Sequence, residues 1–287
     1  MGTAAGAFVL AGGRSSRMGT AKADLEWHGS TLLHRTTALL ARVVDGPVLV
    51  VAAPGQVLPA LPDGVGVVED PVEGLGPLAG IGAGLAALAG RAEVAFACST
   101  DLPFLHPAFV RHVLRAVVDG VGGVGRVDGV DGVDGVDGVG GVDVALPHAR
   151  GFRQPLAAAY RTSLAPLVAS LVAGGKLRPG MLYDRCTVAV LDDAALLADP
   201  DVARLDPDLD SLTNVNAPDD YAAARAVPAP VVRVGLRTVR AATVGALGVG
   251  AVILDGRRVD DPLTPLATGD VVRLAAGSAR AGTRTGP

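Results

Sequence analysis

Aromatic residues are scarce in this sequence. Phe, Trp and Tyr make up only 3% of its 287 residues, whereas 49% are hydrophobic, so a buried core must be built from Val, Leu and Ala side chains. Few rings argue against stacking on nucleic-acid bases. The net charge is −4, and the Arg and Lys residues are scattered, which leaves no basic stripe for a polyanion. We therefore expect no nucleic acid among the partners.

Cysteines and long apolar runs are also few. The two cysteines, Cys98 and Cys186, lie far apart and form no CxxC or Cys/His spacing, which excludes a zinc site and a disulfide scaffold. No uncharged apolar run reaches the roughly 18 residues of a membrane-spanning helix, and the N-terminal stretch lacks the basic region of an export signal. We expect a cytoplasmic protein that has no membrane partner.

Short apolar runs alternate with helical patterns along the first 200 residues. This alternation predicts an α/β fold in which helices cover both faces of a mostly parallel sheet, a three-layer Rossmann-like arrangement. In such sheets ligands bind at the carboxyl ends of the strands. The predicted strands are residues 7–11, 47–53, 66–68, 94–99, 142–146 and 188–191, and the predicted helices are residues 31–44, 78–88, 107–118 and 162–173.

Composition changes mark the boundaries of smaller units. A VDG repeat within residues 119–143 lacks the proline of collagen and the ligand spacing of an EF-hand, and it predicts a long loop between a helix and a strand. The segment VPAPVV marks a linker, after which the residues alternate as in β-strands. We predict a first domain at 1–226, a linker at 227–233, a small β-rich domain at 234–276 and a disordered tail at 277–287.

The segment LAGGRSSRMGTAK, residues 10–22, directly follows the first predicted strand. Glycines at this place, Gly12 and Gly13, allow backbone N–H groups to approach a phosphate closely. Arg14, Arg17 and Lys22 add positive charge within the same loop. The spacing fits neither the GxxxxGK[ST] phosphate loop nor GxGxxG. The residues alone predict an anion-binding loop, with a simple turn carrying solvated charges as the alternative.

Polar residues follow other apolar runs. Asp101 comes after the run VAFACST and before LPFL, where a carboxylate can serve as a hard ligand for Mg²⁺ or simply as a turn residue. Asn214 and Asn216 point the same way if their segment is extended. The alternative for NVNAPDDY is a helix start with Pro218 in its first turn.

Two further segments are candidates for ligand contact. Asp70 ends an apolar run and precedes a glycine-rich stretch that includes Gly76; the alternative there is a tight turn into a helix packed closely on the sheet. Arg153 and Gln154 lie in GFRQPLAAAY, for which the alternative is a surface hairpin. The five histidines show no mutual spacing that suggests a metal site or a catalytic triad.

These motifs together resemble those of a known family. LAGGRSSRMGTAK matches the signature LAGGxSxRMGxxK of the MobA-like nucleotidyltransferases, the molybdenum cofactor guanylyltransferases. The resemblance spans most of residues 1–225. It continues through Ser30–Leu33, Val68–Asp70, Gly76–Gly80, Asp101–Leu105, Gln154–Ala158 and Asn214–Asp220.

The resemblance implies a fold, a reaction and a set of site residues. The fold is that of the nucleotidyltransferases, and the reaction transfers GMP from GTP to the terminal phosphate of molybdopterin, with release of pyrophosphate. Arg17, Lys22 and Asp101 take the catalytic roles, and Mg²⁺ is held by Asp101 and Asn216. Arg153 and Gln154 lie on the acceptor side. The nucleotide is bound by Leu10, Ala11, Gly12, Gly13, Lys22, Asp70, Gly76 and Asp101.

Two other functions stay open at this point. A cytidylyl- or sugar-phosphate nucleotidyltransferase would keep the chemistry. Members of the cytidylyl group usually have LAAG where this chain has LAGG, so Gly12 favours guanine. Residues 230–280 resemble the β-grasp sulfur carriers of molybdopterin synthesis through DGRRVDDPLTPLATGDVVRL, so a non-catalytic carrier is the other alternative. Those carriers end in Gly-Gly and this chain ends in Thr-Gly-Pro, which favours a domain that docks a molybdoenzyme maturation or pathway protein.

Overall fold

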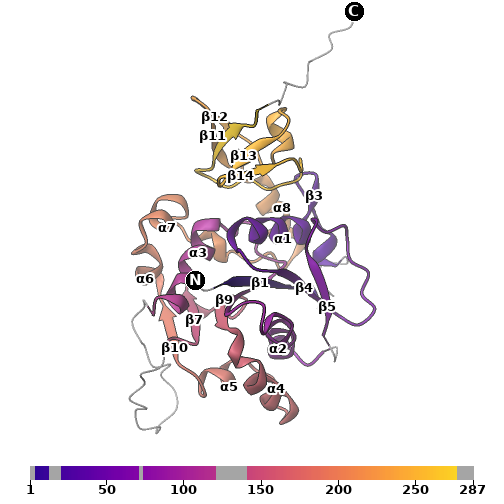
Figure 1. The fold of residues 1–287 in the computed structure, drawn as a ribbon, viewed down its shortest axis with the longest axis vertical. Coiled ribbons are helices and arrows are strands. Elements are labelled where there is room, and N and C mark those ends of the chain that lie inside the picture. The colour runs from indigo at the N-terminus through magenta and orange to yellow at the C-terminus, as the bar shows by residue number, and fades with distance from the viewer. Residues whose placement is uncertain (1–3, 13–20, 71–73, 121–140, 277–287) are drawn as a thin grey trace, which may run out of the picture.

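A computed structural model describes residues 4–12, 21–70, 74–120 and 141–276, and its centre is an eight-stranded sheet (Figure 1). The strand order is β10-β7-β9-β6-β1-β4-β5, and the short β8 pairs with β7. Its strands are β1 (Ala5–Leu10), β4 (Val48–Ala52), β5 (Gly66–Glu69), β6 (Val94–Ser99), β7 (Val144–Ala149), β8 (Phe152–Arg153), β9 (Ala157–Arg161) and β10 (Val188–Leu191).

Most neighbouring strands of this sheet are parallel. β1 pairs in parallel with β4 and β6, as do β4 with β5 and β10 with β7. β9 is the exception, because it runs antiparallel to both β6 and β7. The predicted mostly parallel sheet is therefore confirmed. The short β8 is also antiparallel to its neighbour, β7. Because β6 and β7 are both antiparallel to β9, they run in the same direction and their carboxyl ends lie at the same edge.

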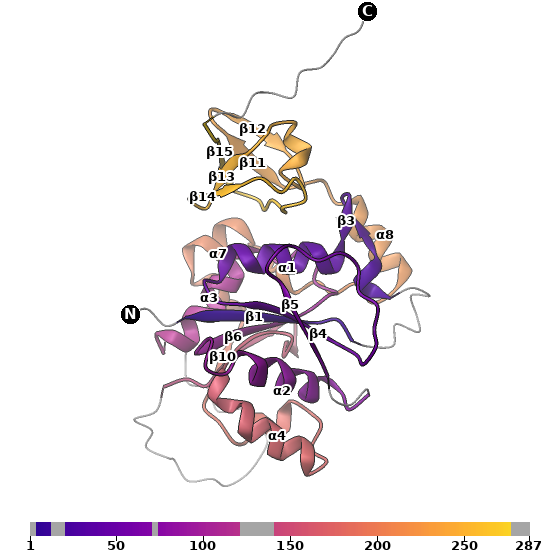
Figure 2. The ribbon, with the colours of Figure 1, turned by 45° about the vertical axis from the view of Figure 1, so that its right-hand side comes forward.

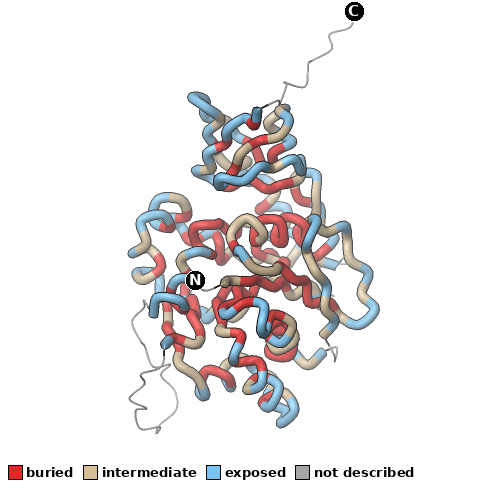
Figure 3. Tube along the Cα trace, in the orientation of Figure 1, coloured by how far each residue is buried: buried red, intermediate tan, exposed pale blue. Residues whose placement is uncertain are grey.

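Helices cover both faces of the sheet and form the three predicted layers (Figures 1 and 2). Along β1, Ala7 and Val9 face one hydrophobic cluster and Phe8 faces the other, as the alternation of side chains along a strand requires. All three are fully buried, and Figure 3 shows this burial along the centre of the molecule. The covering helices are α1 (Leu32–Val43) and α3 (Pro107–Val118) on the first face, and α2 (Pro77–Leu88) and α4 (Ala165–Ala173) on the second.

Local signals explain where these helices begin. The Thr31 side chain accepts a hydrogen bond from the His34 backbone N–H at the start of α1, and His106 does the same for Ala108 at the start of α3. α2 lies very close to the sheet, since a Cβ at Gly84 would stand 2.5 Å from the Phe8 ring. Glycine in this helix thus permits close packing.

The chain then leaves the sheet and passes through short helices to α8, whose first residue is Pro218, as the helix-start alternative predicted. Within the described ranges, no helix combines the length and the hydropathy needed to cross a bilayer. The remaining elements of this part are β2 (Glu26–Trp27), β3 (Ser30–Thr31), α5 (Gly180–Tyr183), α6 (Asp193–Leu197), α7 (Pro200–Leu205) and α8 (Pro218–Ala226), with short 3₁₀ turns at Lys22–Asp24, Thr162–Leu164 and Asp210–Leu212. A further 3₁₀ turn, Gly245–Leu247, lies in the C-terminal part of the chain.

A second, five-stranded sheet follows, which we call the C-terminal sheet, and the predicted β-rich appendage is thereby confirmed. Its order is β12-β11-β15-β13-β14, so the first and last strands lie side by side at the centre, in parallel, as in a β-grasp sheet. It has a core of its own around Val232, Val252 and Val272. Its strands are β11 (Val231–Val234), β12 (Arg237–Arg240), β13 (Val252–Leu254), β14 (Arg257–Val259) and β15 (Val271–Leu274).

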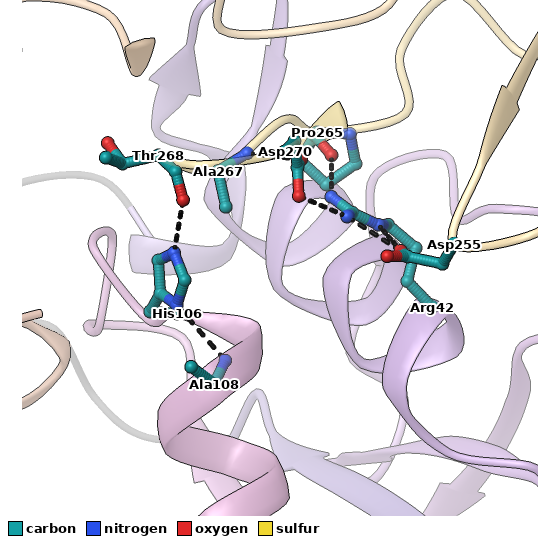
Figure 4. A network of polar contacts seen from close by, with 8 residues as sticks. All are labelled: Arg42, His106, Ala108, Asp255, Pro265, Ala267, Thr268 and Asp270. Atoms are coloured by element: carbon teal, nitrogen blue, oxygen red, sulfur yellow. Dashed lines mark hydrogen bonds and ion pairs between the residues drawn. The ribbon is translucent and has the colours of Figure 1, made fainter. Parts of the chain in front are cut away.

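Arg42 of α1 makes several contacts with the part of the chain that carries the C-terminal sheet (Figure 4). Arg42, whose side chain is only 8% exposed, forms ion pairs with Asp255 at 2.8 Å and with Asp270 at 2.9 Å. It also donates a hydrogen bond to the Pro265 carbonyl at 2.6 Å. A second contact joins His106 Nε2 and the Thr268 carbonyl oxygen at 3.0 Å. Of the VDG loop predicted at 119–143, residues 121–140 lie outside the described residues, as does the predicted tail at 277–287.

Candidate active site

Three of the predicted site residues meet at the carboxyl edge of the large sheet. Lys22 Nζ donates to Asp101 Oδ2 at 3.0 Å and to Asn216 Oδ1 at 2.7 Å. The three residues come from the 3₁₀ turn after the glycine loop, the end of β6 and the segment before α8. The first and last are 194 positions apart in sequence. The fold thus assembles one cationic and two oxygen-bearing groups at a single point.

Neighbouring groups fix the Asp101 turn. Ser99 Oγ donates to Asp101 Oδ1, and the backbone N–H of Val215 donates to the Asp101 carbonyl at 2.9 Å. The Lys22 and Asp101 side chains remain 19% and 17% exposed, so a ligand in solvent can reach them. Nothing in the sequence pattern singled out Ser99, because its role depends on the Asp101 rotamer.

Asn216 is held by the first turn of α8. Asp220 Oδ2 accepts hydrogen bonds from the backbone N–H groups of Asn216 at 3.0 Å and of Ala217 at 2.9 Å. A carboxylate at a helix N-terminus is also favoured by the helix dipole. Asn214 does not contact Lys22; its side-chain nitrogen donates to the Leu212 carbonyl at 3.4 Å. Of the two asparagines, only Asn216 therefore reaches Lys22.

α8 also fixes the hairpin that follows Lys22. Tyr221 Oη donates to the Glu26 carbonyl at 2.5 Å, and Arg225 forms an ion pair with the Glu26 side chain at 2.7 Å. The Arg225 guanidinium lies 5.9 Å from the centre of the Trp27 ring. These contacts anchor the hairpin beside Lys22 to the helix beside Asn216.

The glycine loop is described only at its start. Ala11 donates from its N–H to the Val51 carbonyl at 2.9 Å and accepts from Gln56 Nε2 at 3.1 Å. A Cβ at Gly12 would stand 3.2 Å from the Ala53 nitrogen, so glycine allows the loop to pass close to the end of β4. The predicted residues Gly13 and Arg17 lie outside the described residues, as does Arg14.

Asp70 and Gly76 frame the entry to α2. The Asp70 N–H donates to the Ala52 carbonyl at 2.8 Å, which places Asp70 just beyond the end of β5. Gly76 has φ of +84° and caps the N-terminus of α2. Both residues therefore lie at the carboxyl edge of the sheet, and the positive φ explains why glycine occupies position 76. Leu10 ends β1 at the same edge.

Arg153 and Gln154 belong to the β7–β8 hairpin. Arg153 is exposed and pairs with His148, and the Gln154 N–H donates to the Pro147 carbonyl at 2.8 Å. The local structure is thus the hairpin that was one alternative for this segment. Because β7 and β6 run the same way, this hairpin projects from the edge that carries Asp101.

The Lys22 site has the ligands of a hard cation. The Asp101 carboxylate and the Asn216 amide oxygen both contact the Lys22 ammonium, and both are oxygen groups of the kind that binds a hard cation. In the ranges that the structure describes, no group of three or more His, Cys, Asp or Glu side chains could hold a metal ion. The donor set fits an ion that takes one carboxylate from the protein and most other ligands from phosphates and water, as Mg²⁺ does.

Comparison with known proteins identifies the family. The model of the MobA-like NTP transferase domain matches residues 7–185. Proteins named probable molybdenum cofactor guanylyltransferase are similar: that of Mycobacterium tuberculosis is 37% identical over 179 residues, covering 61% of this chain and 77% of its own. That of Mycobacterium ulcerans is 35% identical over 200 residues, covering 68% of this chain and 88% of its own.

Solved structures share the fold. Molybdopterin-guanine dinucleotide biosynthesis protein A from Archaeoglobus fulgidus has a TM-score of 0.56 at 19% identity and covers 77% of this chain and 96% of its own. The 4-diphosphocytidyl-2C-methyl-D-erythritol synthase from Anaerococcus prevotii has a TM-score of 0.50 at 12% identity, covering 79% and 98%. With the family model over more than half of its length, this chain is a nucleotidyltransferase and belongs to the MobA-like NTP transferase family.

Proposed function

We propose that this enzyme transfers GMP from GTP to the terminal phosphate of molybdopterin and releases pyrophosphate. The observation that carries the proposal is the convergence of Lys22, Asp101 and Asn216 at the strand ends. The mycobacterial relatives named as guanylyltransferases support the choice of substrates. A phosphate acceptor is already anionic at neutral pH, so the reaction needs no general base.

In this proposal the protein works by positioning and charge neutralisation. Lys22 and Arg17 neutralise the triphosphate, and the loop from Leu10 to Gly13 approaches it through backbone N–H groups. Asp101 and Asn216 hold Mg²⁺, which when bound withdraws charge from the phosphate oxygens.

The remaining site residues surround the two substrates. We propose that Asp70 and Gly76 contact the nucleoside of GTP, because they lie beyond the end of β5 on the same edge as Lys22. We place molybdopterin near Arg153 and Gln154, on the hairpin that projects from that edge.

An Asp101→Asn variant tests the site. It keeps the size of the side chain but removes the charge that pairs with Lys22, so pyrophosphate release from GTP in the presence of molybdopterin should fall by roughly 100-fold or more. The matched control is Asp24→Asn, at an exposed residue in the same 3₁₀ turn as Lys22, which should retain activity. Near-normal turnover of Asp101→Asn at saturating Mg²⁺ would refute the assignment.

The main rival is transfer of another nucleotide by the same machinery. The Anaerococcus protein is named for a cytidylyl product and has the same fold, which leaves the base open. Gly12 in the LAGG sequence favours guanine. In the presence of Mg²⁺, GTP should raise the melting temperature more than CTP, ATP or UTP at equal concentration. Stronger protection by CTP would favour the rival.

We further propose that the C-terminal sheet belongs to the separate domain predicted at 234–276 and that this domain docks a molybdoenzyme maturation or pathway protein. Its first strand, β11, begins at Val231, inside the predicted linker at 227–233. The support for docking is the exposed leucine at the β11–β12 turn, Leu236, with Val271 and Leu274 also exposed. Leu236→Asp should reduce co-purification of such a protein with the full chain and leave pyrophosphate release unchanged. Equal recovery of the partner with both chains would contradict this role.

A further inference from the structure

A cleft lies between the large sheet with its helices and the C-terminal sheet. Its volume is about 170 Å³. Its lining includes Trp27, Arg35 and Phe104 from the first part of the chain, Val227 from the connecting segment and Thr268 from the C-terminal sheet. At about 30 Å³ per water molecule, the cleft holds roughly five or six waters, which is space for one small polar group and too little for a nucleotide.

Arg35 is the unusual residue of this cleft. It is only 9% exposed, and its Nε donates to the Pro103 carbonyl at 2.7 Å. Among the described residues, no hydrogen bond or ion pair reaches its Nη1 or Nη2. Burial, with a further effect of Arg42, lowers its pKa to about 10, so the guanidinium still carries its charge at neutral pH. A buried cation with open donors is unfavourable unless an anion or water meets it.

The nearby carboxylate of Asp270 is engaged elsewhere. Asp270 Oδ1 pairs with Arg42 at 2.9 Å, and Oδ2 accepts from the Ala267 N–H at 2.8 Å (Figure 4). Arg35 and Arg42 are two turns apart on α1, so they lie on one face of the helix. Arg42 has three protein acceptors, whereas Arg35 has one, which its Nε uses. The two Nη groups of Arg35 are therefore available to a ligand in the cleft.

The other walls fit a compact ligand. Trp27 and Phe104 meet edge to face, with ring centres 5.7 Å apart, and provide an apolar side. His106 is already used at both ring nitrogens, by Thr268 and Ala108. The aspartates Asp206, Asp208 and Asp210 line another wall. Asp206 accepts hydrogen bonds from the Ser211 N–H at 3.3 and 3.4 Å, and Asp210 pairs with Arg150 at 3.5 Å. Because these carboxylates make that wall acidic, the cleft suits a ligand with a single negative group, placed at the Arg35 end.

We infer that this cleft binds a small oxyanion group, a phosphate or a carboxylate, held by Nη1 and Nη2 of Arg35 in the two-pronged manner typical of guanidinium groups. The site is separate from the Lys22 site and independent of the reaction proposed above.

The single tryptophan of the chain reports on this cleft directly, because Trp27 lines it. The full chain is titrated in separate experiments with inorganic phosphate and with acetate, against sodium chloride at matched ionic strength, while Trp27 fluorescence is recorded. We expect a saturable change with at least one of the two anions, and the anion that produces it identifies the oxyanion class.

Variants assign the change to Arg35. Arg35→Gln should weaken the apparent Kd at least tenfold, whereas Arg237→Gln, at an exposed arginine outside the cleft, should not alter it. Lys22→Ala should also leave it unchanged, which separates this cleft from the Lys22 site.

A second pair keeps the test valid if Arg35→Gln does not fold. Val227 is 46% exposed at the cleft, so Val227→Glu adds a carboxylate without disturbing a core, and Val227→Gln adds the same bulk without charge. We expect tenfold weaker binding for the Glu variant than for the Gln variant. The inference is overturned if neither anion gives a saturable change in the wild type, if the change depends on Lys22, or if Val227→Glu binds as Val227→Gln does.

Discussion

Asp206 carries a carboxyl group whose burial disfavours its ionised form. It is 5% exposed, and burial raises its pKa to about 6 against its hydrogen bonds with Ser211, which lower it. The pKa of this carboxyl group is higher in the folded than in the unfolded state. Such a group contributes its full stabilisation at pH values below its pKa in the unfolded state. The contribution is lost as the pH rises through its pKa in the folded state. Asp206 should therefore weaken the fold above about pH 6.

Replacement of Asp206 by Asn tests this effect. At pH 7.5 the variant should gain up to about 3 kcal/mol in unfolding free energy, because roughly two pKa units of unfavourable ionisation are removed. The gain should shrink toward pH 4, which urea denaturation at several pH values would reveal. Asp208→Asn, at an exposed neighbour, is the control and should show no such trend. A gain that stays constant with pH would refute the explanation.

Single residues were predictable where they follow a strand or belong to a motif. Lys22, Asp101 and Asn216 satisfy that condition, and the structure brings the three together. Arg35 and Asp206 do not. Their burial arises from segments that are distant in sequence, and no local pattern in α1 or around α7 distinguishes a buried charge from one in solvent.

At the scale of elements, α2 shows most clearly how close packing determines which residues a helix can contain. None of its three glycines has room for a side chain. A Cβ added at Gly80 would lie 3.1 Å from Leu10, one at Gly82 would lie 2.8 Å from Val168, and one at Gly84 would lie 2.5 Å from Phe8. The contact with Phe8 would be the tightest. Phe8 is held in strand β1 and Gly84 in helix α2, so neither can move aside easily. α2 thus lies at a distance from the sheet that only glycine permits.

Gly84→Ala should therefore destabilise the protein by about 1–3 kcal/mol, despite the better helix propensity of alanine, because overpacking forces Phe8 or the helix to move. Urea denaturation measures the change. Gly180→Ala in α5 is the matched control, since nothing lies within 4 Å of its added Cβ, and it should be neutral or slightly stabilising. Equal stabilities of the two variants would contradict the packing argument.

The bounds of the elements followed closely from the sequence, and their directions did not. Apolar runs and capping residues located the large helices and the parallel strands within a few residues. β9 shows the limit of this approach, because Ala157–Arg161 is not among the strands predicted from the apolar runs, and its residues contain no information about which neighbours it pairs with. Direction depends on the hairpin and crossover connections, which are properties of the assembled sheet.

At the scale of the whole molecule, Arg42 joins two separately cored parts. Its side chain is 8% exposed and serves two carboxylates and one carbonyl of the C-terminal sheet. Removing one partner of a buried ion pair leaves the opposite charges unpaired and typically costs about 3–5 kcal/mol. The attachment of the C-terminal sheet therefore depends on α1 as much as on the connecting segment.

Arg42→Met should loosen this attachment. We expect the C-terminal sheet to unfold at a lower temperature than in the wild type, and cleavage at residues 227–230 to become several-fold faster in limited proteolysis. The control is Arg258→Met, which removes an exposed ion pair with Asp260 in the same sheet and should change neither property. Unchanged proteolysis of Arg42→Met would show that other contacts hold the sheet in place.

The 194-residue separation of Lys22 and Asn216 has a consequence for the protein while it is being made. At translation rates of about 5–20 residues per second, Asn216 is added roughly 10–40 s after Lys22. Until then, the strands and helices that carry Lys22 and Asp101 can fold, but the third member of the site does not yet exist. A growing chain thus presents only part of the cluster of Lys22, Asp101 and Asn216 on the ribosome, and the cluster is completed late in synthesis, after the segment before α8 has been made.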